Sequence, residues 1–119
     1  GAAAPQYSEF WVALSSTDPG GDGSGITEPV GAGYARVQTL LSAWTQTGDS
    51  VDNDNEILMP ESTGAWLGGA NLTYFALYDA VAGNFVGKGL LPVPRAVDAT
   101  DIVLRFKEGD LDVQIAAPA

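Results

Sequence analysis

Hydrophobic and polar residues alternate over short stretches of this chain, and glycine or proline interrupts them at short intervals. No window carries the sustained stripe, recurring every three to four residues, that an amphipathic helix shows. Alternation with a period of two is typical of a β-strand with one buried face. The pattern therefore predicts a chain built from short strands.

The clearest pair of predicted strands lies near the C-terminus. Apolar and polar side chains alternate over residues 102–107, a turn sequence follows at 108–110, and the alternation resumes over 111–115. Two alternating stretches joined by a short glycine-containing turn predict an antiparallel hairpin with one solvated face.

Other stretches add to this pair. Residues 72–79 are apolar on both faces, as in a central strand, and a strand from residue 85 is expected to end at Leu91 because Pro92 and Pro94 follow. Further strands are predicted over 8–15, 34–41, 56–59 and 65–67. Seven or eight short strands predict an all-β fold, a single antiparallel β-sandwich of jelly-roll type, with one domain over residues 1–119.

Two segments do not fit this core. Residues 16–33 hold six glycines and two prolines, and residues 45–55 are polar and acidic. Loops of such length are usually functional or become ordered against a neighbour. We expect a Gly-rich arm at 16–33 and an acidic loop at 45–55, with weakly apolar tails at 1–5 and 116–119 that are either frayed or docked on another chain.

Charge and composition exclude several classes of function. Fifteen Asp and Glu against five Lys and Arg give a net charge of −10, so nucleic acid is not an expected partner. Cysteine and histidine are absent, which excludes disulfides, thiolate zinc sites and catalysis that needs either residue. No apolar run is long enough to cross a bilayer and no secretory signal is seen, so no membrane partner is expected.

The acidic segment offers one candidate metal site. Oxygen ligands at Asp52, Asp54 and Glu56 alternate in a way that could converge on Ca²⁺. The spacing lacks the glycine and the distant glutamate of an EF-hand loop, and a solvated acidic loop is the favoured interpretation. No spacing identifies a pair of carboxylates for glycoside hydrolysis, and we predict no catalytic residues.

The aromatic residues and one arginine are candidates for contacts. A sugar-stacking platform is one interpretation of the aromatics, but core or interface packing is favoured because each ring buries a large area. The six rings are Trp11, Trp44, Trp66, Tyr34, Tyr74 and Tyr78. Arg36 lies within a predicted strand, and two interpretations stay open: a surface side chain, or a bidentate partner for a carboxylate of a neighbouring chain.

Short motifs follow one another in a fixed order along nearly the whole chain. They are FWVALSSTDPG at 10–20, TE at 27–28, GYARV at 33–37, NEILMP at 55–60, GAW at 64–66, YFALYDA at 74–80, GNF at 83–85 and LLP at 90–92, before the final hairpin. This order resembles a family of small virion structural proteins of tailed bacteriophages, whose members are commonly labelled tail-fibre or structural proteins.

The resemblance implies a non-enzymatic structural protein on the exterior of a phage particle. Because no long shaft is present, a capsid decoration or cement protein is the first expectation, and a tail-fibre or tail-tip adhesin that binds carbohydrate is the alternative. Expected partners are further copies of the chain, as a dimer or trimer, and the major capsid protein or tail proteins. The expected contact residues are Tyr34, Arg36, Trp66, Asp18 and Asp22.

Overall fold

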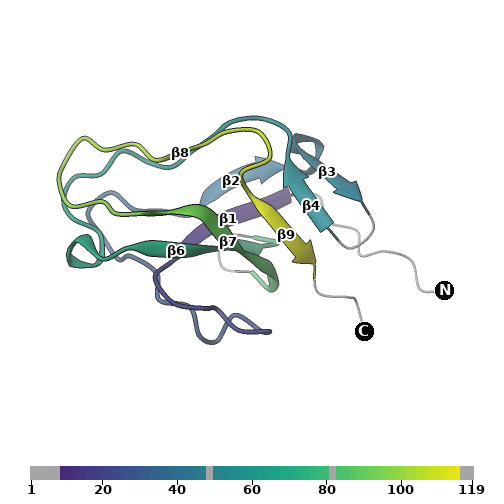
Figure 1. Ribbon diagram of the computed structural model, residues 1–119, viewed down its shortest axis with the longest axis horizontal. Coiled ribbons are helices and arrows are strands. Elements are labelled where there is room, and N and C mark those ends of the chain that lie inside the picture. Colours follow the sequence, from purple (N-terminus) through teal and green to yellow (C-terminus); the bar gives the residue numbers. More distant parts are fainter. Residues whose placement is uncertain (1–8, 48–49, 81–82, 116–119) are drawn as a thin grey trace.

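The computed structural model of the protein describes residues 9–47, 50–80 and 83–115 (Figure 1). Within them lie nine strands and two short 3₁₀ turns, and every recorded strand pairing is antiparallel. The all-β class is therefore confirmed. The strands are β1 (Glu9–Ser15), β2 (Val37–Leu40), β3 (Trp44–Thr47), β4 (Ser50–Asn53), β5 (Ile57–Leu58), β6 (Leu72–Tyr78), β7 (Phe85–Arg95), β8 (Arg105–Phe106) and β9 (Asp112–Ile115), and the turns are η1 (Leu41–Ala43) and η2 (Leu67–Gly69).

The strands form one large sheet and one small ribbon. Seven strands follow the order β2-β1-β6-β7-β9-β4-β3, and β5 pairs with β8 in a separate two-stranded ribbon. Ile57 of β5 and Phe106 of β8 belong to the same buried cluster as the apolar residues of the large sheet. One core thus lies between a broad sheet and a narrow ribbon, rather than between two sheets of similar width.

The large sheet is strongly curled. Its two edge strands, β2 and β3, are consecutive in the chain and only the three residues of η1 separate them. Six strand spacings of about 4.8 Å would place the edges of a flat sheet roughly 29 Å apart. A three-residue connection spans at most about 14 Å, so the sheet has to curl toward closure. The Trp44 indole Nε1 donates a hydrogen bond of 2.8 Å to Thr39 Oγ1 and joins the two edges.

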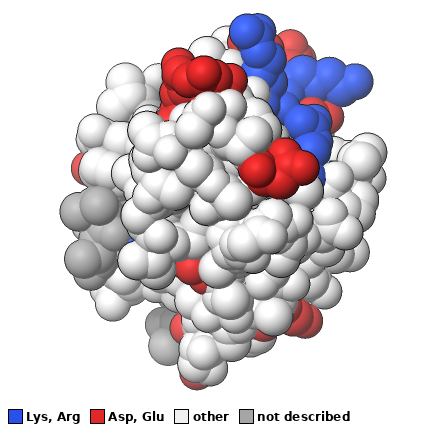
Figure 2. Space-filling view, turned by 90° about the vertical axis from the view of Figure 1, so that its left-hand side faces the viewer, with Lys and Arg blue, Asp and Glu red and all other residues white. Residues whose placement is uncertain are grey.

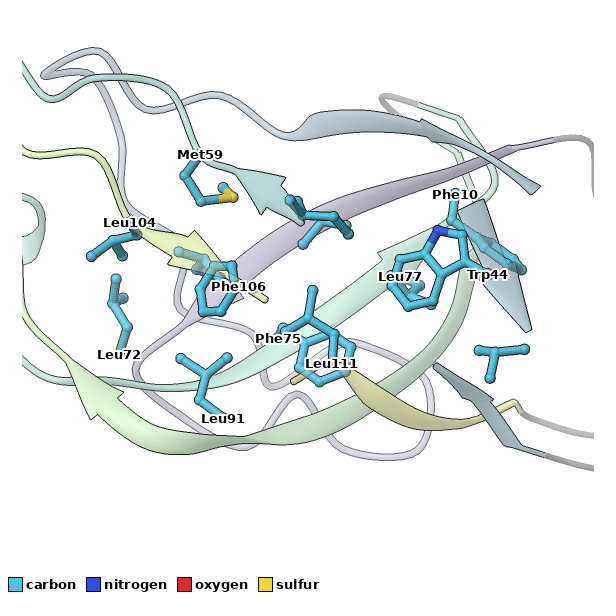
Figure 3. Packing of buried hydrophobic residues seen from close by; sticks show 14 of the residues in the cluster. Phe10, Trp44, Met59, Leu72, Phe75, Leu77, Leu91, Leu104, Phe106 and Leu111 are labelled. Atoms are coloured by element: carbon cyan, nitrogen blue, oxygen red, sulfur yellow. The ribbon is translucent and has the colours of Figure 1, made fainter. Parts of the chain in front are cut away.

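The core fills the inside of this curl (Figure 3). Phe10 of β1 and Trp44 of β3 meet edge to face, with ring centroids 5.7 Å apart, although their strands lie far apart in the sheet order. Met59 and Phe106 contribute from the ribbon side and Leu111 from the residue before β9 of the large sheet, and each is at most 2% exposed. Contacts between residues so distant in sequence bury apolar surface of both the large sheet and the ribbon. This burial is the main contribution to the stability of the fold.

β7 extends further than the prolines indicated. It runs to Arg95 through Pro92 and Pro94 instead of ending at Leu91. Its recorded pairs with β6 stop at Leu90 and resume at Arg95, across a register shift. Proline has no N–H to donate, so it is tolerated in the strand where the β6 ladder is interrupted.

The predicted hairpin over residues 102–115 is not formed, because β8 pairs with β5 while β9 pairs with β4 and β7. The buried side chain of Asn53 explains the separation. Its Nδ2 donates to Lys107 O at 2.9 Å, and its Oδ1 accepts from Leu111 N at 2.9 Å. These two backbone groups flank the turn, and the amide of Asn53 binds both of them from a third strand.

The segment 45–55, expected as an acidic loop, is mostly a hairpin. β3 and β4 pair from Trp44 opposite Asn53 to Thr47 opposite Ser50. Only two residues of these strands, Trp44 and Val51, are apolar and buried, and the third buried side chain is that of the polar Asn53. Thr45 and Asp52 are exposed, and most residues of the segment are polar or charged, which is why its composition resembles that of a loop.

Candidate functional site

The Gly-rich segment 16–33 has no strand or helix, as predicted, but it is tied to itself and to the sheet. Gly25 N donates to Pro19 O at 2.9 Å, and Thr17 Oγ1 donates to Gly25 O at 2.7 Å. The buried Ser15 hydroxyl accepts from Thr27 N at 2.9 Å. These bonds close the segment into a defined loop without a partner chain, so the expectation of an arm that orders only on docking is not needed.

A polar network fixes the end of this loop. The guanidinium of Arg36 donates to both carboxylate oxygens of Glu28, at 3.0 and 2.8 Å, and its Cζ lies 3.8 Å from the ring centroid of Tyr78. The Tyr34 hydroxyl donates to Glu28 at 2.6 Å and accepts from Leu14 N at 3.0 Å. Burial and the neighbouring Glu28 carboxylate raise the pKa of Tyr34, so this hydroxyl stays a donor.

The network answers the question that the sequence left open for Arg36. Its carboxylate partner is Glu28 of the same chain, eight residues away, and the two side chains are 19% and 18% exposed. Tyr34 and Arg36 thus hold the loop on β1 and β6, and their polar groups are already engaged within the chain. Glu28 was missed as a functional residue, although the TE and GYARV motifs contain the pair.

Trp66 does not lie where a partner contact was expected. Its side chain is 1% exposed, its indole Nε1 donates to Ala32 O at 2.8 Å, and Tyr34 meets its ring edge to face at 5.2 Å. Trp66 packs the core beneath the loop, because a large indole gains more from burial than from the surface. Trp44 and Tyr78 are also buried, and Trp11, Tyr34 and Tyr74 are partly buried, so none of the six aromatics is fully exposed.

The two acidic candidates lie on the exposed tip of the loop. Asp18 forms an ion pair with Lys88 of β7 and accepts from Gly20 N at 2.8 Å. The hydrogen bond from Lys88, with that from Gly20, lowers the pKa of Asp18. Asp22 accepts from Ser24 N at 3.0 Å in a tight turn. Val30 is 93% exposed further along the same loop, which makes the loop a surface available for contacts.

A second feature is a cleft between the end of β7 and the β8 region. It has a volume of about 310 Å³, and we call it the basic cleft. Three of the five cations of the chain line this cleft. Figure 2 shows Lys and Arg side chains gathered at one corner of the face that it draws. Its lining residues are Glu56, Pro92, Val93, Arg95, Arg105, Lys107 and Asp110.

The cations of the basic cleft are loosely held. Arg105 Nη1 lies 3.8 Å from Glu56 Oε1, and the two side chains are 67% and 49% exposed. Arg95 donates to Arg105 O at 3.3 Å and lies 5.6 Å from the ring centroid of Phe106. Nothing in the sequence pattern indicated this site, because its residues come from three separate stretches of the chain.

The predicted Ca²⁺ ligands do not converge. Asp52 lies opposite Asp112 across the β4–β9 pair, Asp54 accepts a hydrogen bond from Thr45, and Glu56 faces Arg105. Within residues 9–47, 50–80 and 83–115, no group of three or more acidic side chains is placed to hold a metal ion. Strand alternation and the turn at Asp54 separate the three carboxylates, so the Ca²⁺ site is not supported.

The tails at 1–5 and 116–119, predicted to be either frayed or docked on another chain, lie outside the described residues. A search of the described part for a helix long and apolar enough to cross a membrane finds none.

Comparison with known proteins gives one family. No match was found among curated proteins. The family model Gp80, described as podophage GP4 fiber I protein gp80, matches residues 1–114 of the 119. The match covers nearly the whole chain, in agreement with the resemblance that its ordered motifs show. The chain therefore belongs to the Gp80 family of podophage fibre structural proteins.

Proposed function

We propose that the chain is a non-enzymatic structural subunit of a podophage tail fibre. The observation that carries this proposal is the family match over residues 1–114, whose description names a fibre protein. A fibre family implies a place in the virion. The fold suits such a role, since a rigid curled sheet presents a preformed loop at 16–33 and needs no partner to define it.

Decoration of the capsid was the first expectation from the sequence, and the family match does not confirm it. The family description names a fibre, so the tail is the preferred station. The shape of the subunit does not distinguish the two, because both roles need a compact domain with exposed contact surfaces.

Carbohydrate binding by ring stacking receives little support. A stacking site needs exposed aromatic faces, and Trp44, Trp66 and Tyr78 are each at most 7% exposed. We therefore propose a structural role without an adhesin site built on these rings.

The location is tested by cryo-electron microscopy of virions that carry a C-terminal epitope on this chain, decorated with a Fab fragment. We expect extra density on the tail fibres. Untagged virions incubated with the same Fab are the control. Density over the capsid shell would establish the decoration role instead, and absence from the particle would overturn both.

The non-enzymatic part has its own test. Purified chain incubated with envelope polysaccharide of the host is expected to release no reducing sugar. Turnover that is lost when one carboxylate is replaced by its amide would contradict this part of the proposal.

A further inference from the structure

The five cations of the chain divide into two groups. Arg36 and Lys88 are engaged by Glu28 and Asp18 of the same chain. The other three, Arg95, Arg105 and Lys107, all line the basic cleft. In a chain of net charge −10, the remaining positive charge is thus concentrated on one surface.

The basic cleft has free capacity to bind carboxylates. Arg105 has a long, exposed contact with Glu56, and no partner of the Lys107 ammonium is recorded among the described residues. Three cations face two acids there, so the cleft carries a local excess of positive charge. Val93, which is 59% exposed, adds an apolar wall. Arginine beside exposed apolar surface is the composition enriched at protein–protein interfaces.

The same chain carries a complementary surface. Asp52 of β4 and Asp112 of β9 lie directly opposite each other, and both are exposed. Like charges in this arrangement destabilise a sheet. No ion pair to either carboxylate is recorded in the described part of the chain. The pair therefore lowers the stability of the isolated subunit. A cation of a second molecule placed against the two carboxylates would offset their repulsion.

We propose that the basic cleft of one copy receives the Asp52–Asp112 pair of a second copy of this chain. A second copy is the favoured occupant because both halves of the contact are present on one chain. Two chains of net charge −10 also repel each other over most of their surfaces, so the contact between them has to use the face where cations are in excess.

This inference deepens the proposed structural role, because it names the contact between subunits, and it rests on that role for its biological meaning. The two can fail separately. The location in the virion is measured on particles, whereas the contact is measured on the purified full chain.

The first test is sedimentation equilibrium of the full chain at about 150 mM salt, where a screening length of about 8 Å suppresses long-range repulsion but not direct contacts. We expect association in the wild type and a dissociation constant at least tenfold higher for Arg105→Glu. The matched control, Ala35→Glu with Ala80→Glu, lowers the net charge by the same two units at exposed positions outside the 16–33 loop, the lining of the cleft and the acidic pair, and we expect it to associate like the wild type.

The second test exchanges the charges. Asp52→Lys alone is expected to dissociate, as Arg105→Glu alone does. An equimolar mixture of the two variants is expected to associate. The basic cleft is intact in the Asp52→Lys variant, and it binds the acidic pair that is intact in the Arg105→Glu variant. Circular dichroism of each variant confirms that it is folded.

Three results would overturn the proposal. The first is a wild type that stays monomeric up to about 100 µM, a concentration at which even weak interfaces are populated. The second is an Arg105→Glu variant that associates like the wild type. The third is a mixture that does not associate although both variants are folded. If Arg105→Glu and the control weaken association equally, net charge alone is responsible and the specific contact is rejected.

Discussion

Two arginine–glutamate pairs in this chain have the same chemistry and opposite surroundings. Arg36 and Glu28 are about four-fifths buried, joined by two hydrogen bonds and covered by Tyr78. In the second pair, Arg105 Nη1 lies 3.8 Å from Glu56 Oε1, and the two side chains are 67% and 49% exposed. The first pair is part of the fold, whereas the second leaves its groups available to other molecules.

The difference follows from desolvation. Removing Arg36 would leave the Glu28 carboxylate in a poorly solvated place without its cation, which is costly. Water replaces either partner of the exposed pair at little cost, and salt screens it. An ion pair therefore indicates a structural role only when its surroundings exclude water.

The largest expected effect comes from breaking the buried pair. Arg36→Ala is expected to lower the free energy of unfolding by about 3 kcal/mol, the lower end of what an orphaned buried charge costs. Urea denaturation followed by tryptophan fluorescence measures it. A loss smaller than that of an exposed ion pair would show that water reaches Glu28 freely.

A smaller effect is expected at the third member of the buried network. Tyr34→Phe removes the hydroxyl that binds Glu28 and Leu14 N, and it is expected to cost about 1–2 kcal/mol because a backbone N–H loses its partner. Tyr74→Phe is the matched control, since no hydrogen bond of the Tyr74 hydroxyl is recorded among the described residues. Equal losses in the same urea titration would contradict the assigned role of Tyr34.

A carboxylate pair without a cation behaves in the opposite way. The hydrogen bond shared with Asp112, with that neighbour's charge, raises the pKa of Asp52. The pKa of Asp52 in the folded chain lies above its value in the unfolded chain. The contribution of Asp52 to the free energy of unfolding is therefore favourable at low pH and is lost as the pH rises through the folded pKa. Asp112→Asn is therefore expected to raise the stability at pH 7 by a few tenths of a kcal/mol.

The pH series separates this effect from simple loss of charge. The gain from Asp112→Asn is expected to fade as the pH falls below the folded pKa of Asp52, in urea titrations between pH 3 and pH 7. Asp98→Asn, at another exposed position, is the control. A gain that is independent of pH would show that the two carboxylates do not interact.

The smallest effect is expected at the exposed pair. Arg105→Ala is expected to change the free energy of unfolding by less than about 0.2 kcal/mol, because many exposed ion pairs contribute nothing measurable. The same urea titration measures it beside Arg36→Ala. A loss comparable to that of Arg36→Ala would remove the distinction between the two pairs, and with it the argument that the basic cleft is free for a partner.

The sequence predicted the strands well and their partners poorly. Period-two alternation located most of the strands, because alternation depends only on which face is buried. The hairpin at 102–115 failed because Asn53, about 55 residues earlier in the chain, binds the backbone on both sides of its turn. No local pattern indicates such an insertion. The acidic segment was likewise misassigned, since Trp44 and Val51 are the only apolar residues of its two strands.

The candidate site divides in the same way. The loop at 16–33 was found because glycine and proline mark it directly, and Arg36 was singled out as a lone cation within a strand. Its partner Glu28 and the burial of Trp66 depend on the packing of the loop onto the sheet. The basic cleft joins residues from 56 to 110, and only the tertiary fold brings them together.

The closure of the large sheet at η1 has a consequence for the assembly of copies that we propose above. Exposed strand edges can recruit further chains without limit, as in amyloid. In the described sheet the edge strands β2 and β3 are joined through Thr39 and Trp44, so part of this hazard is removed by the curl itself. Contacts between copies through side chains, as proposed for the basic cleft, can be specific and saturable, whereas backbone addition is neither.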